Sequence, residues 1–295
     1  MSEVSGSPLL ALAGGDWAAT LLPGLGGAFA SLAWHGRDVL VPLPLGADPT
    51  ASFAGAFVMA PWANRLDGGR LPVLGREYRL PINRPQDDTA IHGLSRDRPW
   101  SVAMAAPARA VLAQQVDTTE AGLPWRYAAR LDVALGGGGV AIALALTNLG
   151  DRPAPFGLGW HPFFVRQAGT RLRFRAATLF TRDARCLPVA AQPSDGLDGD
   201  ATAYEGLDTH FAGWDGMAEI VRPDLRLRLA ASGAFAGNLQ IFAPAASGGG
   251  GILCVEPMSH VPDAPNRPEF AAFGSLTMLP PGGVLEGGIS LTAMS

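Results

Sequence analysis

Two segments of the chain combine a proton-transferring side chain with surroundings that suit a ligand cleft. His161 lies in the run 156–164, with aromatic residues on both sides and glycines before it. Glycine allows a ligand to approach the backbone closely. Glu256 follows the apolar run 252–255, and burial there would raise the pKa of its carboxyl toward neutrality, as a general base requires. Each segment also fits a structural role, a packed turn for His161 and an ion pair with Arg65 for Glu256.

Five further side chains could hold a polyol in place. Arginine, asparagine and aspartate can hydrogen-bond to hydroxyl groups, a histidine can do the same, and a tryptophan can stack on the face of a sugar ring. Each also has a structural alternative, namely a salt bridge, a turn cap or a buried histidine bonded to the backbone. As a set with the first two, they predict a site that binds a neutral polyol and moves protons on it. They are Asn64 and Arg65 after Trp62, His92 in the run 90–94, Trp160 before His161, and Asp208 in the run 206–211.

The absence of lysine excludes several catalytic mechanisms. The sequence contains no lysine, so all of its basic side chains other than histidine are arginines. This excludes a Schiff-base lysine, a pyridoxal phosphate lysine and the lysine of a phosphate-binding P-loop. Because arginine stays protonated at working pH, proton transfer must fall to His, Asp, Glu, Tyr or Cys.

Motifs for cofactors and metals are weak or missing. Gly24-Leu25-Gly26 begins a dinucleotide fingerprint, but Phe29 stands where its third small residue should be. No G-x-S-x-G nucleophile motif occurs. Cys186 and Cys254 are far apart in sequence, and none of the five histidines are paired at metal-ligand spacing. We expect free thiols, no metal and no organic cofactor.

The elements that must position these residues are strands. Glycine (38) and proline (25) occur throughout, which favours short strands joined by turns over long helices. Alternation with period two predicts strands with one buried face over 140–148, 171–175 and 224–230. The glycine runs 136–139 and 248–251 each separate two such segments and predict hairpin turns. We therefore expect an all-β chain of two or more packed antiparallel sheets, organised as a single domain over 1–295.

Composition indicates the class of partner. Hydrophobic residues make up 48% and charged residues 16% of the chain, which is enough apolar material for a substantial core. The formal net charge of −4 argues against nucleic acid and anionic membrane as partners. The N-terminus has no basic region before its short apolar run, and no apolar run reaches membrane-spanning length. We expect a cytoplasmic protein that acts on a small molecule.

Six segments, in order over residues 20 to about 290, resemble motifs of the aldose 1-epimerase (galactose mutarotase) family. The run 159–164 resembles the G-x-H-P-[YF]-F motif around one histidine, and 61–66 resembles P-x-x-N-R-[IL]. The other four are the glycine turn 21–28, the first histidine motif 90–94, the aspartate motif 207–211 and the glutamate motif 254–257.

The resemblance implies a galactose-mutarotase-like supersandwich of antiparallel sheets with a sugar cleft on a concave sheet face. It also implies roles: His161 as the general acid for the ring oxygen and Glu256 as the general base for the C1 hydroxyl. Arg65, His92 and Asp208 would hold sugar hydroxyls. The sequence departs from the family at Ala90, where many members have asparagine, and at 281–283, which lacks the acid of the usual P-G-E.

Three other functions stay open. A hexose-phosphate epimerase would need a basic cluster, which Arg65, Arg70, Arg96 and Arg98 could provide. A non-catalytic carbohydrate-binding protein could keep the same cleft. A lyase or hydrolase could use the same fold, although the compact chain shows no obvious extra domain.

Overall fold

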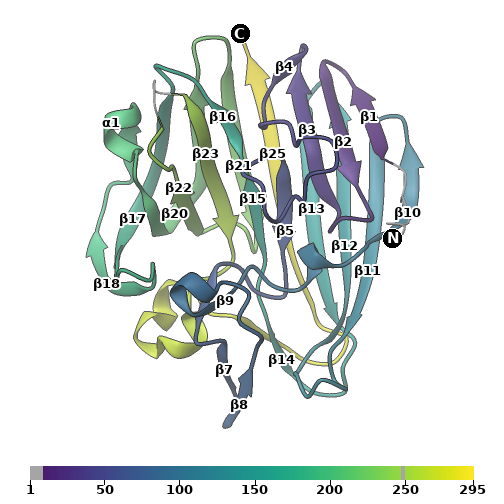
Figure 1. The fold of residues 1–295 in the computed structure, drawn as a ribbon, viewed down its shortest axis with the longest axis vertical. Helices are drawn as coiled ribbons and strands as arrows, with labels where there is room; N and C mark the ends of the chain where they lie inside the picture. Colours follow the sequence, from purple (N-terminus) through teal and green to yellow (C-terminus); the bar gives the residue numbers. More distant parts are fainter. Residues whose placement is uncertain (1–8, 247–249) are drawn as a thin grey trace.

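The computed structural model describes residues 9–246 and 250–295. Antiparallel strands build nearly all of it, in two curved layers that pack face to face (Figure 1). The small hairpin over 70–79 and the coiled turns late in the chain lie toward one end of these layers, at the bottom of the view (Figure 1). The expected all-β fold of packed antiparallel sheets is confirmed.

One layer is a run of long antiparallel strands in which β10, β11, β12, β13, β25, β21 and β20 pair in that order. Strand β20 then pairs with β17, which carries β18 and β19 along its other edge. The strands are β10 (Ser101–Ala106), β11 (Arg109–Asp117), β12 (Arg126–Gly136), β13 (Gly139–Asn148), β17 (Arg171–Arg182), β18 (Pro188–Pro193), β19 (Leu197–Gly199), β20 (Asp208–Val221), β21 (Arg226–Gly233) and β25 (Val284–Met294).

The other layer carries the candidate site. Here β20, β22, β23, β15, β5, β3, β2 and β1 pair in that order, with β4 beside β3 and β16 beside β23. The strands are β1 (Leu10–Gly14), β2 (Trp17–Leu22), β3 (Ala28–Trp34), β4 (Arg37–Asp38), β5 (Ala56–Met59), β15 (Gly159–Pro162), β16 (Phe164–Arg166), β22 (Asn238–Phe242) and β23 (Gly251–Met258).

Short elements complete the described chain. No helix among the described residues is long and apolar enough to cross a membrane. The short strands form the pairs β6 (Arg65–Asp67) with β9 (Thr89–Ile91), β7 (Arg70–Val73) with β8 (Arg76–Arg79), and β14 (Ala154–Phe156) with β24 (Thr277–Leu279); the helical turns are α1 (Ala201–Tyr204) and the 3₁₀ segments Pro85–Asp87, Ser95–Asp97, Ala264–Asn266 and Pro268–Phe273.

Strand β20 belongs to both layers. Its first five residues pair with β22 and its last five pair with β21. Between these halves, Gly213 and Gly216 have φ of +64° and +81°, a conformation that side chains with a Cβ rarely adopt. The two glycines therefore let one long strand turn from one sheet into the other.

Alternation along the strands separates the core from the site. On β23, Leu253 and Val255 enter the main hydrophobic core between the layers, whereas Cys254 and Met258 join a smaller apolar cluster that includes Phe57. Successive side chains of a strand point to opposite faces, so this smaller cluster lies on the outer face of the same sheet. The candidate site occupies that outer face.

The predicted strands and the first hairpin are confirmed. Gly136 pairs with Gly139 across the turn from β12 to β13. The alternating hydrophobic residues of the three predicted strands are all buried. Strands β22 and β23 pair as expected around the second glycine run, of which residues 248 and 249 lie outside the described chain.

Candidate active site

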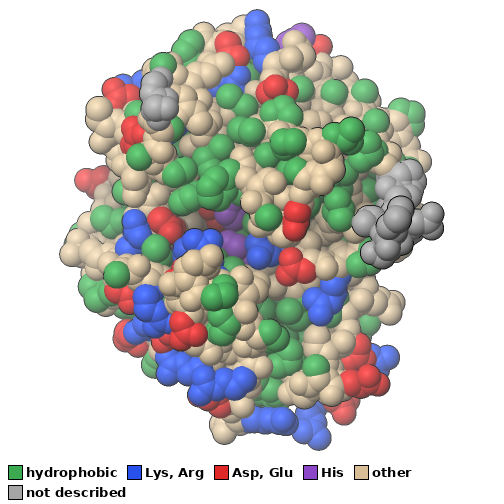
Figure 2. All heavy atoms as spheres, viewed as in Figure 1, with side chains coloured by type: hydrophobic (Ala, Val, Ile, Leu, Met, Phe, Trp, Pro, Cys, Tyr) green, Lys and Arg blue, Asp and Glu red, His purple; other side chains and the backbone are tan. Residues whose placement is uncertain are grey.

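Neighbouring strands of the second layer bring the central residues of the site together. Gln240 on β22 is the register partner of Glu256 on β23, and His161 on β15 is the partner of Phe57 on β5. Asp208 begins β20, next to β22. In the space-filling view, the histidine side chains near the centre sit in a hollow, with basic side chains on both sides and a hydrophobic group above them (Figure 2).

His161 and Glu256 form a buried pair at the centre of this group. His161 Nε2 lies 3.4 Å from Glu256 Oε1, and the two side chains are only 9% and 2% exposed. His161 Nδ1 and Glu256 Oε2 have no hydrogen-bond partner among the described residues. Buried polar atoms are nearly always paired, so each unpaired atom marks a place where a ligand could bind.

Burial sets the protonation of this pair. Burial and, less strongly, the nearby Arg96 guanidinium lower the pKa of His161 to about 3. Burial also raises the pKa of Glu256 well above its usual range, reinforced by Asp208 and opposed by Arg65. Both causes favour the neutral forms, so the proton that the pair holds resides on Glu256 rather than on His161.

A connecting segment carries His92 across the face of the sheet. His92 Nδ1 accepts a hydrogen bond of 3.3 Å from the backbone N–H of Asn64. Burial lowers the pKa of His92 well below its usual value, so its ring is neutral and Nε2 carries the proton. The His92 ring lies edge-on to that of His161, with 5.1 Å between centroids. His92 is thereby set as a hydrogen-bond donor beside the central pair.

Arg65 and Asp208 belong to one network. The Arg65 guanidinium donates to Asp87 at 3.0 Å, to Asp208 at 3.3 Å and to the Asn64 side-chain oxygen at 3.4 Å. Asp208 also accepts a hydrogen bond of 2.6 Å from the Gln240 amide. These contacts fix the guanidinium and the carboxylate in place, which preorganises them to bind sugar hydroxyls.

The structure brings together His161, Glu256, Arg65, His92 and Asp208. Asn64 lies beneath them, fully buried, where its side-chain oxygen supports Arg65.

The prediction that Trp160 binds substrate is wrong. Trp160 is fully buried in the main core, where its ring packs edge-on against Phe29 and Phe164. It directly precedes His161 on β15, so the alternation of the strand directs the two side chains to opposite faces.

Three residues of the site are not among those that the sequence predicts. Gln240 could have been found, because it is a polar residue in the apolar strand that precedes the strand of Glu256. Asp87 gave no signal, because its contact with Arg65 spans 22 residues and depends on how the connecting segment folds back. Phe57 gave none either, since an aromatic residue in an apolar run is ordinary core material.

One group in the site could hold a metal. Single ligand atoms of His161, Cys254 and Glu256 all lie within 4.8 Å of one another. Burial raises the pKa of the Cys254 thiol well above its usual value, with Glu256 adding to the effect, so the thiol is protonated and a poor ligand at neutral pH. The donor set therefore suits proton transfer between His161 and Glu256 better than metal binding.

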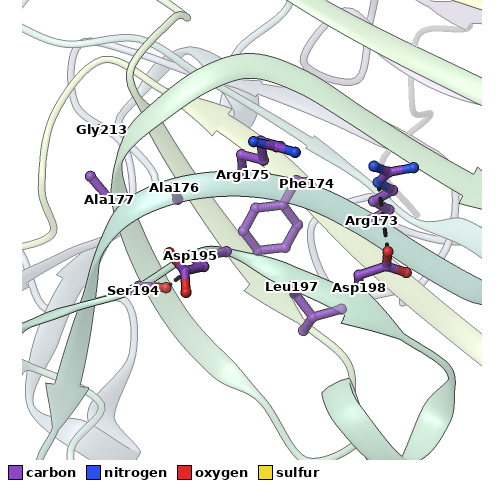
Figure 3. Close-up of a pocket in the computed structure, with 11 residues that line it drawn as sticks. Arg173, Phe174, Arg175, Ala176, Ala177, Ser194, Asp195, Leu197, Asp198 and Gly213 are labelled. Carbon is purple, nitrogen blue, oxygen red and sulfur yellow. Dashed lines mark hydrogen bonds and ion pairs between the residues drawn. The ribbon is translucent and has the colours of Figure 1, made fainter.

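A separate hollow lies along β17, lined by residues from that strand, from 194–198 and by Gly213 (Figure 3). Its charged side chains include Arg173 and Asp198, which form an ion pair of 3.7 Å and are both more than half exposed. Exposed ion pairs of this kind are strongly solvated and contribute little energy. The buried cluster around His161 is the better candidate for chemistry.

Known proteins resemble this chain in sequence and in structure. A curated relative, the uncharacterized protein YphB of Escherichia coli K12, is 29% identical over 242 residues, which cover 79% of this chain and 81% of the relative. Among solved structures, a galactose mutarotase-like protein from Clostridium acetobutylicum has a TM-score of 0.82 at 18% identity, covering 97% of this chain and 94% of that one. A galactose 1-epimerase from Lactobacillus acidophilus NCFM has a TM-score of 0.78 at 15% identity, covering 100% and 97%.

These structural matches show a shared galactose-mutarotase-like fold. The sequence model of the family described as aldose 1-epimerase matches residues 11–292, which is nearly the whole chain and includes every residue of the site. The chain belongs to the aldose 1-epimerase family.

Proposed function

We propose that this protein interconverts the α and β anomers of a hexose, as an aldose 1-epimerase. The observation that carries the proposal is the buried pair of His161 and Glu256, 3.4 Å apart, each with a second polar atom that lacks a partner among the described residues. Such a pair can give one proton and take another. The fixed hydrogen-bonding groups of Arg65, Asp208 and His92 surround it.

The reaction needs two proton transfers on one sugar. In the proposed mechanism, His161 protonates the ring oxygen while Glu256 removes the proton of the C1 hydroxyl. The bond between C1 and the ring oxygen breaks, and C1 becomes the carbonyl carbon of the open aldehyde. After rotation about C1–C2, Glu256 returns its proton to the carbonyl oxygen and His161 takes back the proton from the former ring oxygen, which closes the ring on the opposite face of C1. Each positioned acid or base typically contributes about 10²- to 10⁴-fold.

The resting protonation of the pair fits this cycle. The proposed roles require the shared proton on His161 at the moment of ring opening. Transfer from Glu256 to His161 across their 3.4 Å contact would supply that state without exchange with solvent. The net charge of the pair stays the same, but the transfer converts two neutral groups into a buried imidazolium–carboxylate ion pair, which sugar hydroxyls hydrogen-bonded to both groups would stabilise.

Polarimetry of freshly dissolved α-glucose and α-galactose tests the proposal. We expect the wild-type protein to accelerate the approach to anomeric equilibrium. His161→Gln and Glu256→Gln should each lower kcat about 10²- to 10⁴-fold. His35→Gln is the matched control, because the His35 side chain is 49% exposed and pairs with Asp16 far from the site.

Two outcomes would contradict the proposal. One is a folded His161 or Glu256 variant that keeps most of the activity. The other is a wild-type protein that binds a sugar in calorimetry and leaves its anomer exchange unchanged, which would indicate a non-catalytic carbohydrate-binding protein.

A further inference from the structure

A second arginine stands at the candidate site without a carboxylate bonded to it. Arg96 lies in the 3₁₀ turn Ser95–Asp97, four residues after His92. Its side chain is only 10% exposed, and its guanidinium carbon lies 5.1 Å from the centroid of the Phe57 ring. That ring in turn lies 4.8 Å from the ring of His161 and 5.7 Å from that of His92. The cation is therefore part of the wall around the two histidines.

The charge of Arg96 is poorly compensated within the described chain. Its ion pair there joins Nε to Asp97 at 3.5 Å, which is too long for a good hydrogen bond, and the Asp97 side chain is 45% exposed. Nε has no hydrogen-bond partner among the described residues. Arg65 differs, because both Asp87 and Asp208 bond to its guanidinium.

The other charges around Arg96 do not alter this balance. The negative charge of Asp48 acts to raise the pKa of Arg96. However, Asp48 is exposed, and one of its oxygens already accepts two hydrogen bonds from Thr50. Arg84 adds a further positive charge. A cation that is nine-tenths buried without a bonded anion is costly.

Burial lowers the pKa of Arg96, although arginine remains charged. The field of that charge reaches the reacting groups, since it lowers the pKa of both His92 and His161. An uncompensated cation at this position would be stabilised by an anion delivered with the substrate.

We propose that Arg96 binds an anionic substituent of the sugar, a carboxylate or a phosphate, so that the preferred substrate is an acidic pyranose. Guanidinium matches the geometry of both groups through paired hydrogen bonds. The inference rests on the proposed function of the same site. Of the four arginines named above as a possible basic cluster for a sugar phosphate, Arg96 is the one that would recognise the anionic group.

Calorimetric binding separates this inference from the catalytic one. The titrants are glucose, glucuronate and glucose 6-phosphate, measured with the wild-type protein, Arg96→Gln and Arg98→Gln. Arg98 is the matched control: it lies two residues away on the same segment, and its guanidinium bonds to the Leu94 carbonyl at 2.8 Å.

We expect at least one charged sugar to bind about 10- to 100-fold more tightly than glucose, as for a hydrogen bond to a charged group. Arg96→Gln should remove that advantage and change the affinity for glucose less than about 3-fold, on the same basis. Arg98→Gln should keep it. Which charged sugar shows the advantage distinguishes carboxylate from phosphate. Equal affinity of the wild-type protein for charged and neutral sugars, or an equal loss for all three in Arg96→Gln, would overturn the inference.

The catalytic proposal can fail separately. Acceleration of mutarotation without any preference for charged sugars overturns the role of Arg96 and leaves the epimerase activity. A preference in binding that depends on Arg96, without acceleration of any of the three sugars, supports the role of Arg96 and contradicts the epimerase activity.

Discussion

His161 and Glu256 meet on the outer face of a sheet where almost no water reaches either side chain. Burial favours the neutral form of each group, so it lowers the pKa of His161 and raises the pKa of Glu256. The pair therefore holds a single proton over a wide range of pH. A catalyst that must give one proton and take one proton needs this state.

The pH dependence of kcat follows from that state. Activity should be lost on the acid side only when the pair takes up a second proton, and the pKa of His161 is lowered to about 3. The acid limb of the rate profile should therefore lie well below the ordinary histidine value of about 6.5. Stopped-flow polarimetry from pH 9 down to about pH 3, restricted to pH values at which the protein stays folded, tests whether activity persists below pH 6.5.

Arg96→Gln provides the control for this profile. The Arg96 charge lowers the pKa of His161, so the variant should shift the acid limb to higher pH. An acid limb near pH 6.5 in the wild-type protein would show that the imidazole is not desolvated in this way.

At the residue scale, the sequence indicated which residues lie together better than it indicated the orientation of each side chain. His161 and Glu256 each had a structural alternative, and the structure places the two side chains 3.4 Å apart. Trp160 was placed wrongly because its neighbour is in the site, although adjacent residues of a strand face opposite ways. The contact of Arg65 with Asp87 joins segments whose approach no local pattern describes.

At the scale of elements, the site depends on how the segment 60–97 crosses the outer face of the sheet. Leu94 and Ser95 both donate their backbone N–H groups to the Ala60 carbonyl, at 2.6 and 3.0 Å. Gly93 lies against this carbonyl with φ of +76°, and a Cβ there would overlap it. Gly93 thus allows the close approach that holds His92 and Arg96 over the sheet.

Gly93→Ala should destabilise the protein by about 3 kcal/mol or more, because it combines a left-handed conformation with a backbone clash. Gly75→Ala is the matched control, since Gly75 has φ of +82° and no atom lies within 4 Å of the position that its Cβ would take. The control should cost only about 1–2 kcal/mol, the conformational part. Urea unfolding of both variants gives the comparison, and equal losses would contradict the close contact at Gly93.

The strands themselves were largely predictable. Period-two alternation located the long strands and the glycine run located the turn after β12, because both signals are local. Residues 60–97 have no such regularity. Their path is fixed by contacts with distant groups, for example the bond from the Ala63 N–H to His260, 197 residues away.

At the scale of the molecule, β20 links the two layers, because it places Asp208 beside β22 while its other end pairs with β21 in the opposite sheet. We propose that the chain forms one domain for this reason, since neither layer could keep all its pairings without the other. The site would then share its stability with the whole fold.

Acid should destabilise that fold. Burial lowers the pKa of His92, His161, His210 and His260, so below about pH 6.5 the unfolded chain binds more protons than the native one. Each histidine then removes about 1.4 kcal/mol of stability per pH unit. The raised pKa of Glu256 has the opposite effect and cancels the contribution of about one histidine. The net loss of stability is therefore roughly 4 kcal/mol per pH unit between pH 6 and 5.

Urea unfolding at pH 7.5, 6 and 5 measures this loss. Glu256→Gln should make the loss steeper, because it removes the opposing group. Stability that stays constant or rises from pH 6 to 5 would show that the histidines are not buried in their neutral forms.

The most direct test of the catalytic account is magnetisation exchange between the α and β H1 signals of a sugar already at anomeric equilibrium. Exchange is measured for glucose, glucuronate and glucose 6-phosphate with a catalytic amount of protein. The account predicts faster exchange for at least one sugar with the wild-type protein, and a return to nearly the uncatalysed rate with Glu256→Gln. An uncatalysed rate for all three sugars with folded wild-type protein, at concentrations where calorimetry shows binding, would contradict it.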